Sequence, residues 1–440
     1  GARRCPLART VHFSGAMRDE GQWSLGRRIG FRFGFLVGAL IVFPFPLGLM
    51  PGTDGIASVA EAPMRWLVEV VRSLLGAPEA YAGPNGSGDT SVAYVQMLTI
   101  AALAAVGTLV WSIWRRRDPA YPRLAAVGRV TLRYYLATYM LSYGGIKLTK
   151  GQFPDLSPST LHARLGDLPP MRLMWAFMGY SLPYTVTAGA AEVLGGVLLF
   201  WRRTTTLGAL VIIVVMTNVV LMNLCYDIPV KLLSSILLTT ALVLVAPDAR
   251  RLLSVALGQP AAAAASPRVP TAPRWRWARR GAKVLAIVLL AYSPARDALQ
   301  QRPHDDHRHE LYGNWRVDTF VLAGVEHPPL TTDRERWATL SANPRSMQIW
   351  GMAGAFEGRG VGTERGYYAL VVDPFARTIL VTHDAGKTQE VWRYRRPAAG
   401  ELILDGVHRG QSFHVVAHLE PQGELLSRGF HWINEVPHNR

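Results

Sequence analysis

Long apolar runs separated by short basic or polar segments make up most of the first 300 residues of the chain. A run of about 20 apolar residues is long enough to cross a bilayer as a helix. By this measure seven spans are predicted, the last of them short for a span: Ile29–Met50, Val92–Trp114, Leu124–Leu148, Leu182–Trp201, Leu207–Tyr226, Val230–Ala246 and Gly281–Pro294. This part of the sequence therefore predicts a polytopic α-helical membrane protein.

From Leu311 onward the hydrophobic period changes from that of helices to two, which is typical of half-buried strands. The predicted strands are Trp315–Leu322, Met347–Met352, Tyr367–Val372, Thr378–Thr382, Glu390–Arg395, Leu402–Leu404, Ser412–Leu419 and Leu426–Trp432. Several short strands separated by turns predict a small antiparallel β-barrel or sandwich.

These patterns divide the chain into five parts. Residues 1–28 are a cytoplasmic N-terminal segment, 29–122 carry the first two spans with an outer loop, 123–253 form a four-helix core, 254–303 hold a linker and the seventh span, and 304–440 form an extracytoplasmic β-rich domain. In the outer loop, the amphipathic stretch Val59–Leu75 predicts a helix that lies along the membrane surface. Residues 1–16 show no structural pattern, and we expect Met17 to be the start of the natural protein.

The distribution of charge predicts an orientation and excludes one class of partner. The formal net charge is +16, but acidic and basic residues nearly balance beyond Glu310, so the excess lies in the membrane half. Its Arg residues cluster in alternate loops, which predicts a cytoplasmic N-terminus and an external C-terminus in a bacterial inner membrane. Because membrane topology accounts for the excess positive charge, that charge does not indicate a nucleic-acid partner. If Cys5 precedes the true start, Cys225 is the only thiol, which excludes an internal disulfide.

Glu192 is the most informative candidate site residue because it is the only charged side chain in Leu182–Trp201. A carboxylate at mid-depth costs about 2.5–3.5 kcal/mol on insertion scales, so such groups face a bundle interior and a partner. Glu192 shares a helix face with small residues such as Gly189 and Gly196, which allow close helix contact. It is therefore expected to face another helix, as a packing residue or as a proton-handling acid.

Partners for Glu192 come from neighbouring spans. In the third span Arg133, Tyr143 and Lys147 lie at helical spacing on one face, while Asn223, Asp227 and Lys231 cluster at the turn between the fifth and sixth spans. We predict a polar pocket with Lys147 and Glu192 as catalytic groups and with five substrate-binding residues: Arg133, Tyr143, Asn223, Asp227 and Lys231. Asp227 and Lys231 could alternatively form only a surface ion pair.

Neither a metal site nor a cofactor motif is predicted. His304, Asp305, Asp306, His307 and His309 are crowded together, but in a stretch that reads as a solvated linker.

The stretch from about Gly128 to Leu253 resembles the DoxX family of four-helix bacterial membrane proteins. The resemblance rests on Arg133, on GGIKL around Lys147, on AAEVLGG around Glu192 and on the arginine-flanked RRTTTLGA and PDARRLL. It implies a subunit of a membrane redox system, including quinone-linked ones.

A related resemblance is to the transmembrane domain of vitamin K-dependent carboxylases, in which Lys147 would match an intramembrane lysine beside a quinol pocket. In the tail, Gly313-Asn314-Trp315 resembles the opening of lipocalin-type barrels, where Trp315 would plug one end.

The leading hypothesis is a quinone- or lipid-linked redox subunit in which Lys147 holds a carbonyl or anionic head and Glu192 passes protons. It implies no intrinsic cofactor, a quinone as the bound molecule, and the bilayer and a redox subunit as partners. Two alternatives stay open: a scaffold or lipid-handling protein that delivers an apolar molecule to a barrel cavity, and a quinol-dependent carboxylase-like enzyme. Whether the chain is itself catalytic is not decided by its sequence.

Overall fold

The computed structural model describes residues 23–78, 86–116, 120–261, 273–301, 309–352, 367–383 and 388–435. Expectations for Cys5, Met17 and His304–His307 lie outside these ranges. The chain forms two compact units: one comprises residues 1–148 and 187–300, and the other comprises 149–186 and 301–440. The segment 149–186, placed in the four-helix core by the sequence pattern, thus groups with the C-terminal domain.

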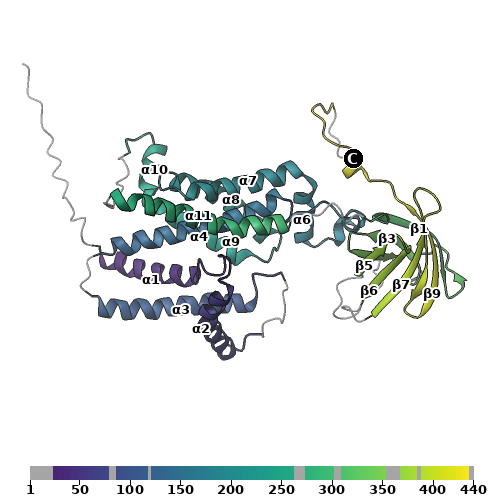
Figure 1. The fold of residues 1–440 in the computed structure, drawn as a ribbon, viewed down its shortest axis with the longest axis horizontal. Coiled ribbons are helices and arrows are strands. Elements are labelled where there is room, and N and C mark those ends of the chain that lie inside the picture. The colour runs from purple at the N-terminus through teal and green to yellow at the C-terminus, as the bar shows by residue number, and fades with distance from the viewer. Residues whose placement is uncertain are drawn as a thin grey trace, which may run out of the picture. The chain divides into compact units, whose positions relative to one another are not determined.

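The first unit is helical. Its elements are α1 (Leu25–Val42), α2 (Asp54–Leu74), α3 (Ser91–Trp114), α4 (Pro122–Leu148), α7 (Leu182–Leu199), α8 (Thr205–Cys225), α9 (Lys231–Val245), η2 (Ala246–Asp248), α10 (Ala249–Ala256) and α11 (Pro273–Gln300), with the first residues of α7 belonging to the second unit. The axes of the long helices α3, α4, α8 and α11 are roughly aligned (Figure 1). A core of apolar side chains, including Leu136, Met140, Ile212 and Leu237, joins α4, α8 and α9.

Four helices within the described residues are long and apolar enough to cross a membrane. They are α3, α7, α8 and the continuous stretch Lys231–Ala256, which begins with α9. They confirm four of the predicted spans. The other three predicted spans also contain helices, namely α1, α4 and α11, but charged residues such as Arg32 in α1 and Arg133 in α4 lower their apolar character. The count of seven spans is therefore not supported by length and composition.

The first predicted span extends too far. Helix α1 ends at Val42 rather than at Met50, and turns follow it. Pro44 and Pro46 lie in those turns. Proline lacks an amide hydrogen and its ring clashes with the preceding helical turn, so two prolines end the helix despite the apolar residues around them.

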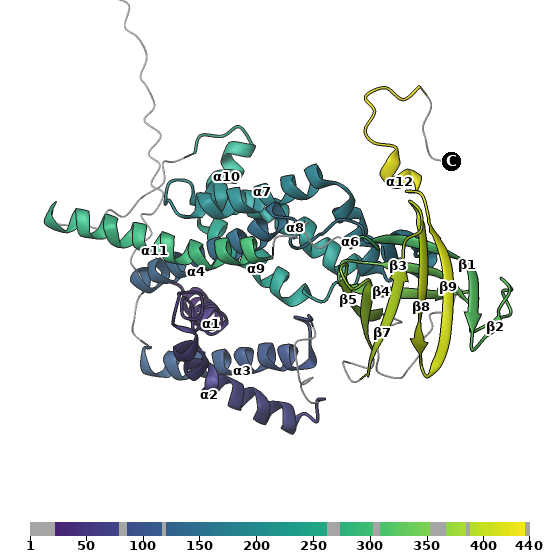
Figure 2. The same ribbon diagram turned by 45° about the vertical axis from the view of Figure 1, so that its right-hand side comes forward.

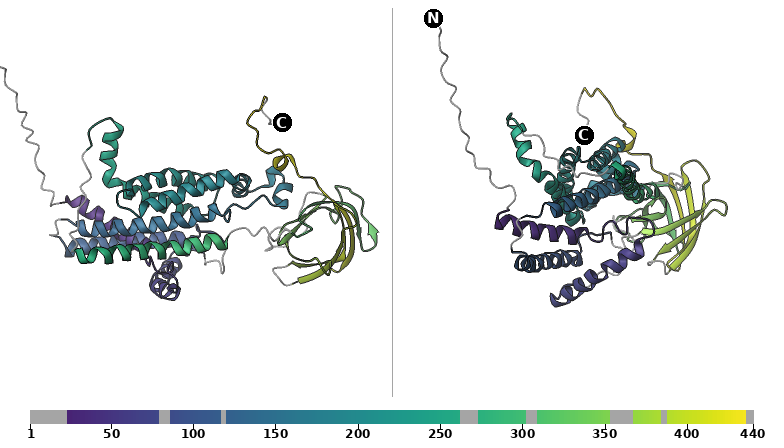
Figure 3. Two further views of the ribbon diagram at one scale, coloured as in Figure 1. Left: turned by 45° about the horizontal axis from the view of Figure 1, so that its top comes forward. Right: turned by 60° about the vertical axis from the view of Figure 1, so that its left-hand side comes forward.

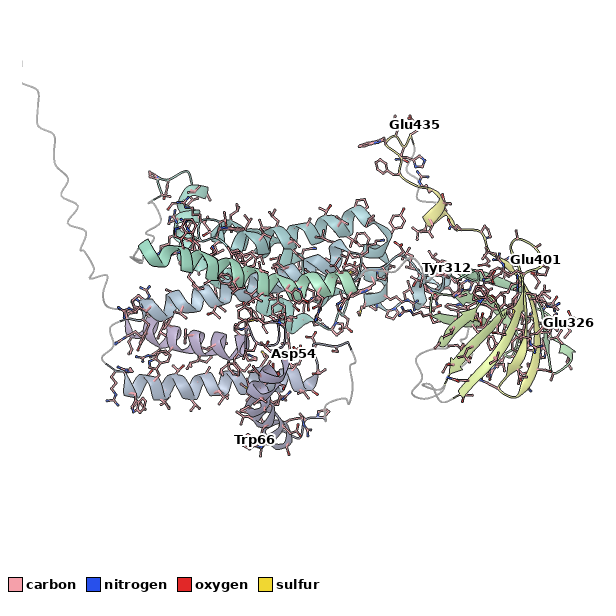
Figure 4. All side chains as sticks on the ribbon, viewed as in Figure 1. Asp54, Trp66, Tyr312, Glu326, Glu401 and Glu435 are labelled. Atoms are coloured by element: carbon pink, nitrogen blue, oxygen red, sulfur yellow. The ribbon has the colours of Figure 1, made fainter. Side chains whose placement is uncertain are left out.

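The amphipathic stretch of the outer loop folds as predicted into α2, which begins earlier than expected, at Asp54. Its Trp66 is 68% exposed and lies on the side of α2 that faces away from the other helices (Figure 4). Placement of this helix at a membrane surface stays a prediction.

The second unit contains a helical segment and a β-barrel. The segment holds α5 (Pro158–His162), the short η1 (Leu165–Asp167) and α6 (Pro170–Tyr180). The strands are β1 (Gly313–Leu322), β2 (Val325–Glu326), β3 (Trp337–Ala342), β4 (Ser346–Gly351), β5 (Tyr367–Asp373), β6 (Thr378–His383), β7 (Thr388–Arg395), β8 (Glu401–His408) and β9 (Gln411–Leu419). The short helix α12 (Glu424–Ser427) follows them.

The strands form a closed, eight-stranded antiparallel barrel. Each of β3 to β8 pairs with the next strand in the chain, and β1 closes the ring by pairing with both β3 and β9, while β2 extends only the far end of β1. The strands β8, β9 and β1 lie side by side in Figure 2, and the ring is visible nearly end-on in Figure 3. Of the two expected architectures, barrel and sandwich, the barrel is confirmed.

Two strand predictions fail. Residues Leu426–Trp432 do not form a strand: α12 ends at Ser427, and Gly429 then adopts a positive φ of 73°. Conversely, β3 is missing from the prediction. Five of its six side chains are buried, so it lacks the alternation of buried and exposed positions by which half-buried strands are found.

Side chains of the barrel itself fill its interior. The aromatic rings of Phe320, Trp337, Trp392 and Phe413 pack against one another with centroid separations of 5.0–5.7 Å, and each side chain is buried. Trp315, near the start of β1, is buried in the same core, and its indole N–H donates to the carbonyl of Leu311 at 2.7 Å. This packing opposes the hypothesis that an apolar molecule is delivered into the barrel.

Candidate functional site

Lys147 and Glu192 form a buried ion pair between α4 and α7. The Nζ atom of Lys147 lies 2.8 Å from each carboxylate oxygen of Glu192, and the two side chains are 7% and 2% exposed. Both residues come from the predicted pocket, and the prediction that Glu192 faces another helix is confirmed. An ion pair with both oxygens engaged compensates the two charges where water is excluded.

Glycines allow α4 and α7 to approach closely enough for this pair to form. A Cβ atom on Gly144 would lie 2.7 Å from the carbonyl oxygen of Gly189, and a Cβ on Gly189 would lie 2.8 Å from the Cβ of Lys147. Two turns further along α7, a Cβ on Gly196 would meet the Cβ of Met140 at 3.0 Å. The small-residue face of α7 is therefore the contact surface for α4.

A row of tyrosines leads along α4 to Lys147, and the sequence analysis recognised only its last member. Tyr135, Tyr139 and Tyr143 follow one another at a spacing of four residues, with ring centroids 4.8 Å and 6.4 Å apart. The ammonium of Lys147 lies 5.8 Å from the centroid of the Tyr143 ring. The signal that could have revealed the row was the four-residue spacing itself, which places all four side chains on one side of the helix.

Arg133 does not join the pair. It precedes Lys147 by 14 positions on the same helix, which is about 21 Å at 1.5 Å per residue. Its guanidinium donates to the hydroxyl of Thr205 at 3.4 Å and lies over the ring of Tyr134. Arg133 therefore lies toward the opposite end of α4.

Asn223, Asp227 and Lys231 have partners other than the Lys147–Glu192 pair. Asn223 donates to the hydroxyl of Ser234 at 2.9 Å and so joins α8 to α9. Asp227 and Lys231 form an ion pair at 2.8 Å in which the Asp227 side chain is 86% exposed. This is the arrangement that the surface-pair alternative describes.

Asp89 is a polar residue of this region that the sequence analysis missed. Its carboxylate accepts the backbone N–H groups of Lys231 and Leu232 at 2.7 Å and 2.9 Å, and it thereby caps the N-terminus of α9. A carboxylate at a helix N-terminus is favourable because it satisfies free amides and interacts with the helix dipole. The Gly-rich stretch before α3 therefore has a structural role at Asp89.

Arg32 is a second missed residue. It is 2% exposed, and its guanidinium donates to the hydroxyl of Tyr121, the hydroxyl of Ser112 and the carbonyl of Arg115. These bonds tie the middle of α1 to the end of α3 and to the segment before α4. No sequence pattern identified Tyr121 as the partner.

Within the described ranges, no group of three or more His, Cys, Asp or Glu side chains is placed to hold a metal ion. His309, the one member of the histidine-rich linker that falls inside them, interacts through its ring with the backbone carbonyl of Asn343 at 3.0 Å.

Fold and site together define a protein with four apolar helices of membrane-spanning length, an ion pair buried between α4 and α7, and a C-terminal closed β-barrel. No family model matches the chain, and no solved structure matches it either. The chain is 36% identical over 130 residues to the uncharacterized protein YwoB of Bacillus subtilis (strain 168), a match that spans 30% of this chain and 82% of YwoB. The chain therefore belongs to the same family as YwoB.

Proposed function

We propose that the protein is a DoxX-like redox subunit of a bacterial inner membrane that binds a quinone, or a lipid with a comparable carbonyl head, beside the Lys147–Glu192 pair. The observation that carries this proposal is the pair itself. A lysine and a glutamate inside a helical membrane protein are costly, and such residues commonly mark a substrate or proton pathway. A stability role alone would be served equally well by apolar side chains of similar volume.

The residues around the pair fit a quinone chemically. Lys147 supplies a cationic N–H donor for a carbonyl oxygen, and Tyr143 and Val193 supply apolar surface beside it. A bound quinone would contribute the two-electron chemistry. Glu192 would accept or return a proton at its carboxylate, and Lys147 would orient the carbonyl.

The proposed topology has seven spans, with α1, α4 and α11 crossing in addition to the four apolar helices. The charges of α4 are compensated inside the bundle, since Lys147 pairs with Glu192 and Arg129 lies 3.6 Å from Asp248. Helix α4 has 27 residues, which corresponds to a length of about 40 Å, sufficient for a bilayer.

The contacts between basic helix ends support the N-terminus-inside orientation. Arg28 at the start of α1 donates to the backbone carbonyl of Arg116 at the end of α3. Asp248 meets both Arg129 of α4 and Arg251 of α10. Arginine-rich ends therefore gather in the same neighbourhoods, as expected for the cytoplasmic side of a membrane protein. The bilayer and a redox subunit are the partners this proposal requires, and nucleic acid is not among them.

The carboxylase-like alternative is less favoured by the geometry. Such an enzyme needs a hydrophobic pocket directly against Lys147, whereas both oxygens of Glu192 contact Nζ of Lys147 at 2.8 Å.

The test is mass spectrometry of lipophilic molecules that co-purify with the detergent-solubilised full-length protein. We expect a quinone in the wild type, its loss in Lys147→Ala and its reduction in Glu192→Gln. The matched control is Lys283→Ala, which removes a lysine of α11 that lies over the Trp201 ring, away from the pair. A double variant, Lys147→Met with Glu192→Leu, removes both charges together and should keep the fold while losing the quinone. Equal quinone content in all variants, or phospholipid alone in all, would refute the proposal.

A further inference from the structure

The second unit contains a cleft outside its filled barrel. The cleft has a volume of about 840 Å³ and is lined by α5, η1, α6, the residues just before β1, the end of β9 and α12. Ligand pockets commonly measure about 300–1,000 Å³. The cleft is therefore of ligand size, and it lies beside the barrel rather than within it.

Exposed apolar side chains gather around this cleft. Leu165 is 71% exposed, Phe177 59% and Leu425 55%, and Leu161, Leu173 and Leu426 are 38–40% exposed. These residues come from three separate stretches of the chain. Large apolar side chains of separate elements that remain exposed around one concavity are typical of a binding site for an apolar molecule.

The polar groups that line the cleft favour an uncharged head group over an anionic one. No Lys or Arg is among its lining residues, and of its three acidic members, Asp155, Glu420 and Glu424, the first two have the cationic partners Lys150 and Arg316 respectively. Its other polar lining includes Asn314. A site with neutral donors and acceptors suits a hydroxyl or carbonyl group and offers a carboxylate or phosphate no counter-charge.

His162 is the polar residue best placed to recognise such a group. Its ring packs on the indole of Trp350 with centroids 4.9 Å apart, and its Nδ1 lies 3.7 Å from a carboxylate oxygen of Glu420. Burial lowers the pKa of His162 below its usual value, and Glu420 only partly offsets this effect. A neutral imidazole has one donor and one acceptor nitrogen, which matches a hydroxyl group.

The cleft is held in place by direct bonds within the second unit. The backbone N–H of Ser159 in α5 donates to the side-chain oxygen of Asn343, between β3 and β4, at 3.3 Å. Together with the contacts of His162, this bond fixes α5 against the barrel. The binding surface is thus preformed.

We infer that this cleft binds one molecule of an uncharged long-chain lipid, with its chain against α6 and α12 and its hydroxyl or carbonyl group at His162. The site is separate from the Lys147–Glu192 pair and does not depend on the function proposed for that pair. It would give the C-terminal domain a lipid-carrying capacity that its barrel interior does not provide.

The experiment is photo-crosslinking of the full-length protein in nanodiscs with a diazirine-bearing hexadecanol, followed by peptide mass spectrometry. We expect saturable labelling of residues 156–180 and 419–426, which unlabelled hexadecanol competes away. The diazirine-bearing hexadecanoate should label these peptides at least about tenfold less, since the cleft offers its carboxylate no counter-charge.

Three variants locate the site. Leu161→Trp fills the cleft and should abolish saturable labelling, whereas Leu330→Trp, at an exposed position outside the cleft, should not change it. His162→Leu should weaken hexadecanol binding about fivefold, as for the loss of one hydrogen bond. Circular dichroism of the same samples would show that each variant is folded.

Two results would overturn the inference. Non-saturable labelling that is equal for the alcohol and the carboxylate would mean that the surface contacts the bilayer and holds no single lipid. Labelling that persists in folded Leu161→Trp would place the lipid elsewhere. Lys147→Ala separates this inference from the proposed function. It should remove co-purified quinone and leave cleft labelling unchanged, so either proposal can fail alone.

Discussion

Removal of one partner of the Lys147–Glu192 pair should destabilise the helical unit far more than removal of one partner of an exposed pair. Two hydrogen bonds of 2.8 Å join the buried charges, and a hydrogen bond to a charged group contributes about 1.5–3 kcal/mol. Their sum, about 3–6 kcal/mol, agrees with the cost of about 3–5 kcal/mol for leaving one buried charge without its partner. We therefore expect Glu192→Leu to lower the free energy of unfolding by about 3–5 kcal/mol.

The chain offers a matched control with the same atomic separation. Asp227 and Lys231 also lie 2.8 Å apart, but Asp227 is 86% exposed, so water competes for both charges. Asp227→Asn, which removes the charge and keeps a residue type that tolerates the positive φ of 50° at this position, should cost only about 0–1 kcal/mol. The comparison tests the effect of burial at the same 2.8 Å separation, and in the exposed pair Lys231 also keeps Asp89 as a second partner at 3.9 Å.

The assay is equilibrium unfolding in mixed micelles, with a denaturing detergent as titrant and helical circular dichroism as the signal. The double variant Lys147→Met with Glu192→Leu completes a thermodynamic cycle. It should lie within about 1–2 kcal/mol of the wild type because no unpaired charge remains. A cost below about 1 kcal/mol for Glu192→Leu, or a double variant as unstable as the sum of the two single variants, would refute the reasoning.

Three further predictions concern packing and pH. Gly144→Leu should destabilise the helical unit by at least about 1–3 kcal/mol, since even a Cβ would meet the backbone of α7 at 2.7 Å; the same unfolding assay measures it. Trp337→Ala should destabilise the barrel by about 3–5 kcal/mol through the cavity it leaves, as followed by near-ultraviolet circular dichroism during thermal unfolding. The barrel should also lose stability as the pH falls below about 4, because a hydrogen bond from His327 lowers the pKa of Asp333 in the folded state. A thermal-unfolding series from pH 6 to pH 2 measures this loss.

Controls for these predictions are available at the same or comparable positions. Gly26 has no neighbour within 4 Å of a new Cβ, so Gly26→Leu should have little effect, and an equal effect at both glycines would contradict the packing argument. Trp337→Phe should cost less than Trp337→Ala, and equal costs would show that the indole volume is not what stabilises the barrel. Asp333→Asn should flatten the stability profile below pH 4: the lowered pKa makes the carboxylate stabilising above this range, and that contribution is lost on protonation. An unchanged profile would exclude Asp333 as the source.

Much of the fold was predictable because it follows from local periodicity. Apolar runs of membrane length located α3, α7, α8 and α9, and alternation located most of the barrel strands. The failures have local causes as well. Pro44 and Pro46 stop α1 inside an apolar run, and β3 is buried on both faces and so shows no alternation.

The candidate site was predicted only in part. Glu192 and Lys147 were identified individually by the cost of charge in an apolar environment. Their pairing was not predictable, because 45 residues separate them and the sequence offered several other polar partners. Tyr135 and Tyr139 were missed although their four-residue spacing is visible in the sequence. Asp89 was missed because its role depends on the backbone amides of α9, which lie more than 140 residues away in the chain.

The sequence by itself determined which segments are apolar helices, which region is β-structure, and which charged residues need a buried partner. These properties depend on the composition and period of residues close together in the chain. Only the tertiary structure decided that Glu192 meets Lys147, that Asp227 meets Lys231 instead, and that aromatic rings fill the barrel while a cleft remains beside it. Such outcomes depend on the close approach of helix backbones at Gly144 and Gly189 and on the closure of β1 against β9, which bring together residues that are far apart in the chain.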